Sequence, residues 1–236
     1  MKVLITGSTQ GIGYAIAKAM VKAGHAVIVH CSRDLEKCEK IRAELGAAAA
    51  VVCDLSDMKE VEALPEKTGN IDILVLNASV QYRKGILDIT DAEFDTQVSV
   101  NFKSTYKLIR SYVPYMKEQG FGRIITIGSV QQYKPHPDMA VYAATKCAVM
   151  SLVHNFAKQL APFGVTVNNV SPGVIATPRN EAALADAEYS KKVMAGIPAG
   201  FAGVGDDISA AVLMLTSEGG RYITGEDITI DGGMKL

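Results

Sequence analysis

The stretch Lys2-Val3-Leu4-Ile5-Thr6-Gly7-Ser8-Thr9-Gln10-Gly11-Ile12-Gly13 decides the fold of this chain. Residues 2–5 predict a first strand, and a glycine-rich turn leads from it into a helix predicted over 14–23. Glycines let such a backbone approach a pyrophosphate closely, and the free amides and dipole of the helix start favour that anion. We therefore predict a nucleotide-binding turn whose contacts come from Gly7, Thr9, Gln10, Gly11, Ile12 and Gly13.

The glycine spacing narrows the choice of nucleotide. It is Gly-x-x-x-Gly-x-Gly, which departs from the Gly-x-Gly-x-x-Gly fingerprint of many dinucleotide-binding turns. The turn also lacks the Gly-Lys-Ser/Thr ending of a P-loop, which weighs against an ATPase. Taken alone, the stretch is also compatible with a plain glycine-rich turn.

Strand-like and helical segments alternate along the rest of the chain. Strands are predicted over 2–5, 26–31, 48–53, 71–76, 123–127, 165–170 and 227–230, and helices over 14–23, 34–45, 56–68, 91–119, 139–160 and 208–216. This alternation predicts an α/β fold: one Rossmann-like, doubly wound parallel sheet with helices on both faces, in a single domain over 1–236. Residues 175–204 are weakly periodic, which fits either a substrate lid or an ordinary surface excursion.

Composition excludes several classes of protein. Of the 236 residues, 48% are hydrophobic and 21% charged, as in an ordinary globular domain, and the formal net charge is −1. No basic tract suggests nucleic acid, and no segment suggests a signal peptide or a membrane span. The four cysteines form no Cys-x-x-Cys pattern, so we expect reduced thiols and a cytoplasmic protein.

Tyr142 and Lys146 are the first candidate catalytic residues. They lie four residues apart on a predicted helix and so share one face. A lysine there would lower the pKa of the phenol, and a tyrosine so tuned suits general acid–base catalysis. Ser129 ends the strand predicted before this helix and could hydrogen-bond a substrate oxygen. The alternative is a half-buried tyrosine beside a solvated lysine.

Further motifs now extend the pattern, and together the chain resembles the short-chain dehydrogenase/reductase family over essentially residues 1–236. The glycine turn, Ser129, Tyr142 and Lys146 match that family in order and spacing. The other matching positions are Asp54-Leu55, Asn77-Ala78, Asn101, Pro172-Gly173 with Thr177, Tyr222 to Gly225, and Asp231 to Gly233. The resemblance implies hydride transfer between a nicotinamide cofactor and a carbonyl or secondary alcohol.

The resemblance also implies roles for single residues. Tyr142 would exchange a proton with the substrate oxygen, Lys146 would bind the nicotinamide ribose, and Ser129 would orient the carbonyl. Asn101 would link Lys146 to solvent in a proton relay. The implied cofactor contacts, beyond the glycine turn, are Asp54, Leu55, Asn77, Ala78, Tyr142, Lys146, Pro172, Gly173, Val174, Ile175 and Thr177.

Two departures from the family pattern matter. Ser79 replaces a glycine where the backbone passes close to the cofactor. The residue after Gly200 is Phe201, where many acyl-carrier reductases of the family have an arginine. The second departure weakens the case for a fatty-acid substrate without excluding one.

The choice between NADP(H) and NAD(H) is predicted from the end of the second strand. An acidic residue there would select NAD(H), yet Val29-His30-Cys31-Ser32-Arg33 contains none. Ser32 and Arg33 are candidate contacts for a 2′-phosphate, and His30 is a weaker one. We therefore favour NADP(H), with NAD(H) possible if Arg33 is only a solvated charge opening the next helix.

The substrate is predicted only by class. Ser129, Gln131, His136 and Tyr142 are the candidate contacts, and Gln132, Tyr133 and Met139 lie in the same segment. Their mixed polarity suggests a small carbonyl or alcohol such as a keto sugar, polyol or short ketone. A 3-oxoacyl thioester reductase and a non-catalytic dinucleotide-binding sensor remain alternatives. The resemblance also implies a homodimer or homotetramer paired through the two long helices.

Overall fold

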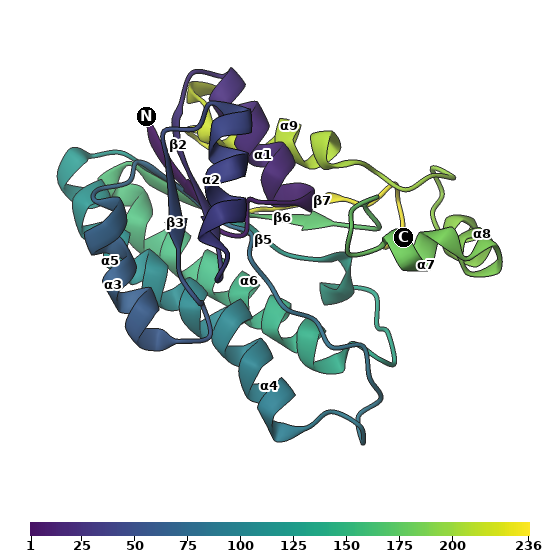
Figure 1. Ribbon diagram of the computed structural model, residues 1–236. Helices are drawn as coiled ribbons and strands as arrows, with labels where there is room; N and C mark the ends of the chain where they lie inside the picture. The colour runs from purple at the N-terminus through teal and green to yellow at the C-terminus, as the bar shows by residue number, and fades with distance from the viewer.

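The structure, a computed structural model, describes residues 1–236 apart from the side chains of Ala182 and Ala183. Its frame is a seven-stranded parallel sheet of order β3-β2-β1-β4-β5-β6-β7, which confirms the predicted fold class (Figure 1). The strands are β1 (Lys2–Ile5), β2 (Ala26–Cys31), β3 (Ala49–Val52), β4 (Ile73–Leu76), β5 (Gly122–Ile127), β6 (Val165–Pro172) and β7 (Asp227–Ile230).

Helices cover both faces of the sheet, because each central strand is apolar on both sides. In β1, Val3 and Ile5 face one buried core and Leu4 faces the other, as the two-residue period of a strand requires. The first core packs against α1 (Gly11–Lys22), α2 (Leu35–Leu45) and α9 (Gly205–Thr216). The second packs against α3 (Met58–Thr68), α5 (Ser104–Gln119) and α6 (Ala140–Leu160).

The strand order reverses between β1 and β4: β2 and β4 pair with β1 from opposite sides, along Val3 to Ile5. A ligand crevice forms at such a switch point, outside the carboxyl ends of the strands. All seven strands are parallel, so the loops that follow them meet at one edge of the sheet. The predicted site residues lie on these loops.

The helix predicted over 91–119 is interrupted. The chain forms α4 (Asp91–Val98), then a π-helical turn, η1 (Ser99–Lys103), and then α5. A capping box between Thr90 and Glu93 starts the segment. Single π-helical turns often occur at functional sites, and this one contains Asn101.

The weakly periodic segment contains two short helices, α7 (Glu181–Ala185) and α8 (Ala187–Ala195). In Figure 1 they lie apart from the sheet, beyond the ends of β6 and β7. That position is compatible with the predicted lid, which stays a prediction. In the described part of the chain, no helix is both long and apolar enough to cross a membrane.

Candidate active site

A cavity of about 940 Å³ opens at the carboxyl ends of the strands. It brings together almost every residue predicted for the site, although they are spread over most of the chain. Of the predicted catalytic and cofactor residues, Gly13 and Asn101 alone lie outside its lining. Those inside are Gly7, Thr9, Gln10, Gly11, Ile12, Ser32, Arg33, Asp54, Leu55, Asn77, Ala78, Ser129, Tyr142, Lys146, Pro172, Gly173, Val174, Ile175 and Thr177.

The glycine turn is packed too tightly for side chains. A Cβ on Gly13 would stand 2.3 Å from the carbonyl oxygen of Gly7, so this glycine lets α1 approach the turn. Gly7 has a positive φ of 64°, which favours glycine. The Asn77 side chain fixes the turn by donating to the carbonyls of Thr6 and Gly7, each at 3.0 Å. Asn77 therefore acts on the turn as well as lining the cavity.

The start of α1 is suited to an anion. Gln10, at its N-cap, makes no side-chain capping hydrogen bond in the described structure. The amide of Tyr14 is the one that bonds back to the carbonyl of Gln10 at 3.2 Å, so the amides before it are left to a ligand. Free amides, a helix dipole and a glycine turn together fit a pyrophosphate.

His30 supports the turn and does not contact a phosphate. Its side chain is buried, and its Nδ1 accepts from the amide of Gly7 at 3.0 Å. Nε2 therefore carries the proton and donates to the carbonyl of Cys53 at 3.1 Å. Burial lowers the pKa of His30 to about 4. The weaker prediction of a phosphate contact is wrong, because both ring nitrogens already have partners.

His30 should make stability depend on pH. In the unfolded chain its pKa is 6.5, so below that pH the unfolded state binds a proton that the folded state excludes. Its stabilising contribution is present above pH 6.5 and is lost as pH falls toward 4. Between pH 6.5 and 5 we expect a loss of about 2 kcal/mol in the free energy of unfolding. His30→Asn, which cannot titrate, should lack this loss in urea unfolding at several pH values; equal slopes in both proteins would refute it.

The residues after β2 form the end of the cavity predicted to hold the adenosine. Arg33 donates to Oδ2 of Asp54 from Nε at 3.1 Å and from Nη2 at 2.7 Å. The exposed side chain of Lys37, one helical turn further on, donates to Oε1 of Gln10 at 3.1 Å. Lys37 also lines the cavity and was missed by the sequence. The available signal in the sequence was a second cation four residues after Arg33, in the charged helix predicted over 34–45.

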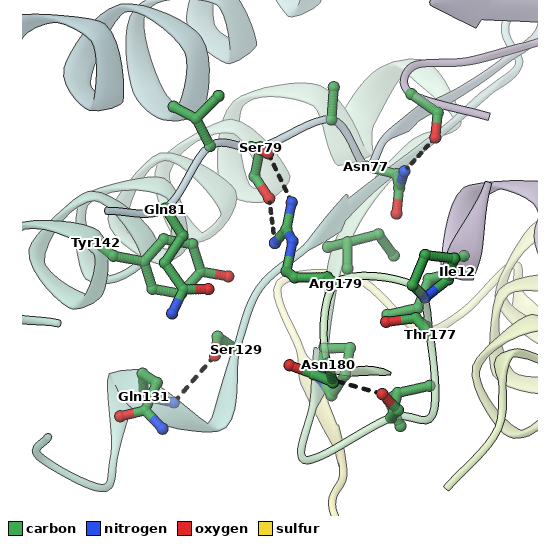
Figure 2. Close-up of a pocket in the computed structure, with 18 of the residues that line it drawn as sticks. Ile12, Asn77, Ser79, Gln81, Ser129, Gln131, Tyr142, Thr177, Arg179 and Asn180 are labelled. Carbon is green, nitrogen blue, oxygen red and sulfur yellow. Dashed lines mark hydrogen bonds between the residues drawn. The ribbon is translucent and has the colours of Figure 1, made fainter. Parts of the chain in front are cut away.

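Ser129 is oriented by the turn that follows β5. Its Oγ accepts from the amide of Gln131 at 3.2 Å, while its own amide donates to Oε1 of Gln132 at 3.0 Å. Because the oxygen already accepts a bond, the hydroxyl proton is left to donate. Ser129 thus presents a donor to the cavity that it lines. Figure 2 shows its bond to Gln131.

Lys146 is buried in α6 beneath the cavity. Its Nζ donates to the carbonyl of Ile127, at the end of β5, at 2.7 Å, and lies 5.5 Å from the centre of the Tyr142 ring. Burial, and then the charge of Arg179, lower the pKa of Lys146 to about 7. This lysine can therefore release or take a proton near neutrality.

The pKa of Tyr142 is raised, not lowered as the sequence predicted. Burial disfavours the phenolate, and it outweighs the charge of Arg179 and hydrogen bonds from Ser129 and Ser79, which favour it. Lys146 points to a carbonyl rather than to the hydroxyl. Tyr142 is therefore protonated at neutral pH, the state that a proton donor needs.

Arg179 is the main residue that the sequence missed. Its Nη1 donates to Oγ of Ser79 at 3.1 Å and its Nη2 to the carbonyl of Ser79 at 2.7 Å. Figure 2 shows the guanidinium next to Ser79, in the same pocket as Tyr142 and Ser129. The Ser79 hydroxyl, which the family glycine would lack, accepts the first of these two bonds, and the Ser79 backbone accepts the second.

Asn101 lies behind the cavity. Its Oδ1 accepts from the amide of Val80 at 2.9 Å, and its Nδ2 donates to the carbonyl of Val80 and to Oγ1 of Thr145. The side chain thus joins the loop after β4 to the helix of Tyr142 and Lys146. Its predicted part in a proton relay stays a prediction.

The segment between Ser129 and Tyr142 divides into two groups. Gln131, His136 and Met139 line the cavity. Gln132 and Tyr133 do not: both reach Asp227 of β7, Gln132 from Nε2 at 3.4 Å and Tyr133 from its hydroxyl. They support the Ser129 turn from behind. The candidate substrate contacts Gln131 and His136 are placed in the cavity, and their role stays a prediction.

Comparison with known proteins agrees with the family resemblance seen in the sequence. The family described as "Enoyl-(Acyl carrier protein) reductase" matches residues 7–235. The 3-oxoacyl-(acyl-carrier-protein) reductase FabG of Haemophilus influenzae is 36% identical over 238 residues, which cover 99% of this chain and 97% of the relative.

Two solved structures extend the comparison. One from Beutenbergia cavernae, described as an NAD(P)-dependent gluconate 5-dehydrogenase with NADP bound at low occupancy, is 33% identical with a TM-score of 0.92 over 99% of this chain and 96% of that one. A 3-oxoacyl (acyl-carrier-protein) reductase from Agrobacterium tumefaciens C58 with NADP bound is 33% identical, with a TM-score of 0.91 over 98% and 93%.

Fold, site and relatives together define the class: the chain belongs to the short-chain dehydrogenase/reductase family. It is an oxidoreductase that acts on carbonyl or alcohol groups. The names of its relatives divide between 3-oxoacyl thioester and sugar-acid substrates, so they leave the substrate of this chain open.

Proposed function

We propose that this protein is an NADP(H)-dependent reductase or dehydrogenase that interconverts a carbonyl and a secondary alcohol on a small polar substrate. The observation that carries the proposal is the single cavity. It combines the glycine turn at one end with Ser129, Tyr142 and Lys146 at the other.

In the proposed reduction, Tyr142 donates its phenolic proton to the substrate oxygen. Its raised pKa keeps that proton in place at neutral pH until charge develops on the oxygen. The nicotinamide cofactor, when bound, supplies or accepts the hydride. Ser129 donates a hydrogen bond to the same substrate oxygen and so polarises the carbonyl. In oxidation the proton returns to Tyr142.

Lys146 has two proposed roles. Its ammonium would hydrogen-bond the nicotinamide ribose, and its charge would stabilise the phenolate that Tyr142 becomes after donation. Its pKa of about 7 also suits reprotonation of the phenol from solvent. Asn101 would complete that path, as the family resemblance implies.

The proposed preference for NADP(H) rests on the adenosine end of the cavity. Arg33 and Lys37 place two cations there, and Ser32 adds a hydroxyl. Arginine donates two parallel hydrogen bonds to a phosphate, which favours the 2′-phosphate over a ribose hydroxyl. The solved relatives from Beutenbergia cavernae and Agrobacterium tumefaciens also hold NADP.

A 3-oxoacyl thioester reductase is the second candidate. The identity of 36% to a FabG protein over 97% of its length favours it. The residue after Gly200 weighs against a thioester substrate. It is Phe201, whose side chain is exposed, and not an arginine that could bind an acidic carrier protein.

Turnover decides between the candidates. The purified protein would be given NADPH or NADH with keto sugars, short ketones, oxo acids and 3-oxoacyl thioesters, and cofactor oxidation followed by absorbance. We expect NADPH oxidation with the small polar carbonyls. Oxidation with thioesters alone would select the second candidate. Tight NADPH binding with no oxidation of any of them would favour the dinucleotide sensor.

We also propose a homodimer or homotetramer. Tyr106 on α5 and Phe156 on α6 stack with ring centres 6.1 Å apart, and Tyr106 is half-exposed, so the two long helices present aromatic surface. Light scattering should give a multiple of the 25.1 kDa chain mass, and a monomer at micromolar concentration would contradict this. A cytoplasmic location stays a prediction.

A further inference from the structure

Positive charge gathers in the half of the cavity where the substrate should bind. Four cations from four different segments line it: Arg83, Lys134, Arg179 and Lys192, with His136 among them. Among the described lining residues, the acidic ones are Asp34 and Asp54. Asp34 follows β2 and Asp54 follows β3, so both lie at the adenosine end. Walls of one charge sign focus the field and attract the opposite charge.

These cations have no carboxylate partner in the described structure. Lys134 donates to the carbonyl of Met234 at 3.1 Å, and Arg83 donates to the hydroxyl of Tyr189 at 2.9 Å. The ion pairs between described residues lie elsewhere: Arg33–Asp54, Arg42–Glu39, Lys84–Glu93, Lys107–Glu62 and Arg221–Glu218. The protein itself leaves this positive charge uncompensated.

Among these cations, Arg179 acts on the reacting groups. Its charge contributes to the lowered pKa of Lys146 and opposes the raised pKa of Tyr142, so it lies within electrostatic reach of both. Ser79 holds it through two hydrogen bonds, one to each terminal nitrogen. A guanidinium has five N–H donors, so others remain for a ligand.

We infer that the substrate is a small oxo acid, or the matching hydroxy acid, whose carboxylate binds Arg179 while Ser129 and Tyr142 hold the oxygen that reacts. This inference rests on the proposed function and narrows its substrate class. The planar guanidinium matches a carboxylate in two parallel hydrogen bonds. Ser79 is a positioning residue, because it holds Arg179 in place. The other cations supply a field that concentrates the anion.

The test compares each acid with an uncharged methyl ester of the same carbon skeleton. Acetoacetate and a keto-gluconate would each be assayed with NADPH against their methyl esters. We expect kcat/KM to be about 10- to 100-fold higher for the acids, the usual effect of a hydrogen bond to a charged group. Arg179→Met should remove that preference, so that the ratio of kcat/KM for acid to that for ester falls close to one. Ser79→Gly should lower the preference partly, mainly through KM.

Lys191→Met is the matched control. Lys191 is exposed on α8 next to Lys192, and it lies outside the described cavity lining. Its loss removes one positive charge from the same segment between β6 and α9 but outside the cavity lining, and the preference for acids should remain. Equal use of acids and esters by the unaltered protein would overturn the inference.

Two further outcomes are informative. If Arg179→Met raised the NADPH dissociation constant as much as KM for the acid, Arg179 would serve the cofactor phosphates and the inference would fall. If no carbonyl were turned over, the proposed function would fail. Calorimetry of gluconate against neutral gluconamide, with the NADP-saturated protein, would still decide this inference: tighter gluconate binding that Arg179→Met abolishes supports it, and equal binding overturns it.

Discussion

Replacing Tyr142 with phenylalanine should lower kcat by about 100- to 10,000-fold, the range that a positioned general acid contributes. The ring would remain, so packing in α6 should be kept. Only the proton donor would be lost. NADPH affinity, measured by fluorescence titration, should change less than about twofold, because binding rests mainly on the glycine turn and the adenosine end. The reduced rate should persist across pH, since no other hydroxyl occupies that place.

Tyr14→Phe is the matched control for that variant. Tyr14 lies outside the main cavity, and its hydroxyl bonds Glu44 on the surface. The kcat of Tyr14→Phe should stay near that of the unaltered protein. If Tyr142→Phe kept full activity, a different group would donate the proton and the proposed mechanism would be wrong.

Replacing Arg33 with alanine should raise the dissociation constant of NADPH by about 10- to 100-fold and change that of NADH by less than about threefold. The 2′-phosphate would lose a charge-assisted pair of hydrogen bonds. The carboxylate of Asp54, which Arg33 now pairs, would be left beside the phosphate. Both changes act against NADPH alone.

Further substitutions on α2 sharpen this prediction. Lys37→Ala should weaken NADPH binding by a smaller factor, since Lys37 lies in the first turn of α2 and its ammonium already bonds Gln10. Lys40→Ala removes an exposed lysine outside the described cavity lining and should have no effect. An equal loss of NADH and NADPH binding in Arg33→Ala would refute the assignment of Arg33 to the 2′-phosphate.

The sequence predicted best what depends on local pattern. The parallel sheet followed from continuous apolar strands and alternating helices. The bounds of these strands and helices moved by a few residues at most, apart from the helix predicted over 91–119, which a π-helical turn interrupts. Tyr142 and Lys146 could be paired because four residues make one helical turn. The glycine turn was identifiable from its position between a strand and a helix.

Contacts between distant segments could not be predicted in the same way. Arg179 meets Ser79 across 100 positions of sequence, in a segment whose helices are too short to show periodicity. His30 was a candidate phosphate ligand until its burial beneath Gly7 showed that the strand turns it inward. The π-helical turn at Asn101 left no mark in the residue pattern, and the bonds of the Asn101 side chain to Val80 join segments 21 residues apart.

The direction of the Tyr142 pKa shift could not be predicted from the sequence either. A lysine one turn away predicts a lowered pKa, but burial acts in the opposite direction and is stronger here. Burial depends on the whole fold, whereas spacing depends on one helix. Only the structure gives the balance between the two.

The central claim is that a hydride passes from the cofactor to a carbonyl carbon while Tyr142 protonates the oxygen. The most direct test follows a deuterium label through such a reduction. The protein would be incubated with an oxo acid and NADPH in which both hydrogens on the reactive carbon of the nicotinamide ring are replaced by deuterium, and the product analysed by mass spectrometry. We predict a hydroxy acid that carries one deuterium on the carbinol carbon, and almost no product with Tyr142→Phe. Unlabelled product, or no product from any carbonyl while NADPH binds tightly, would contradict the account.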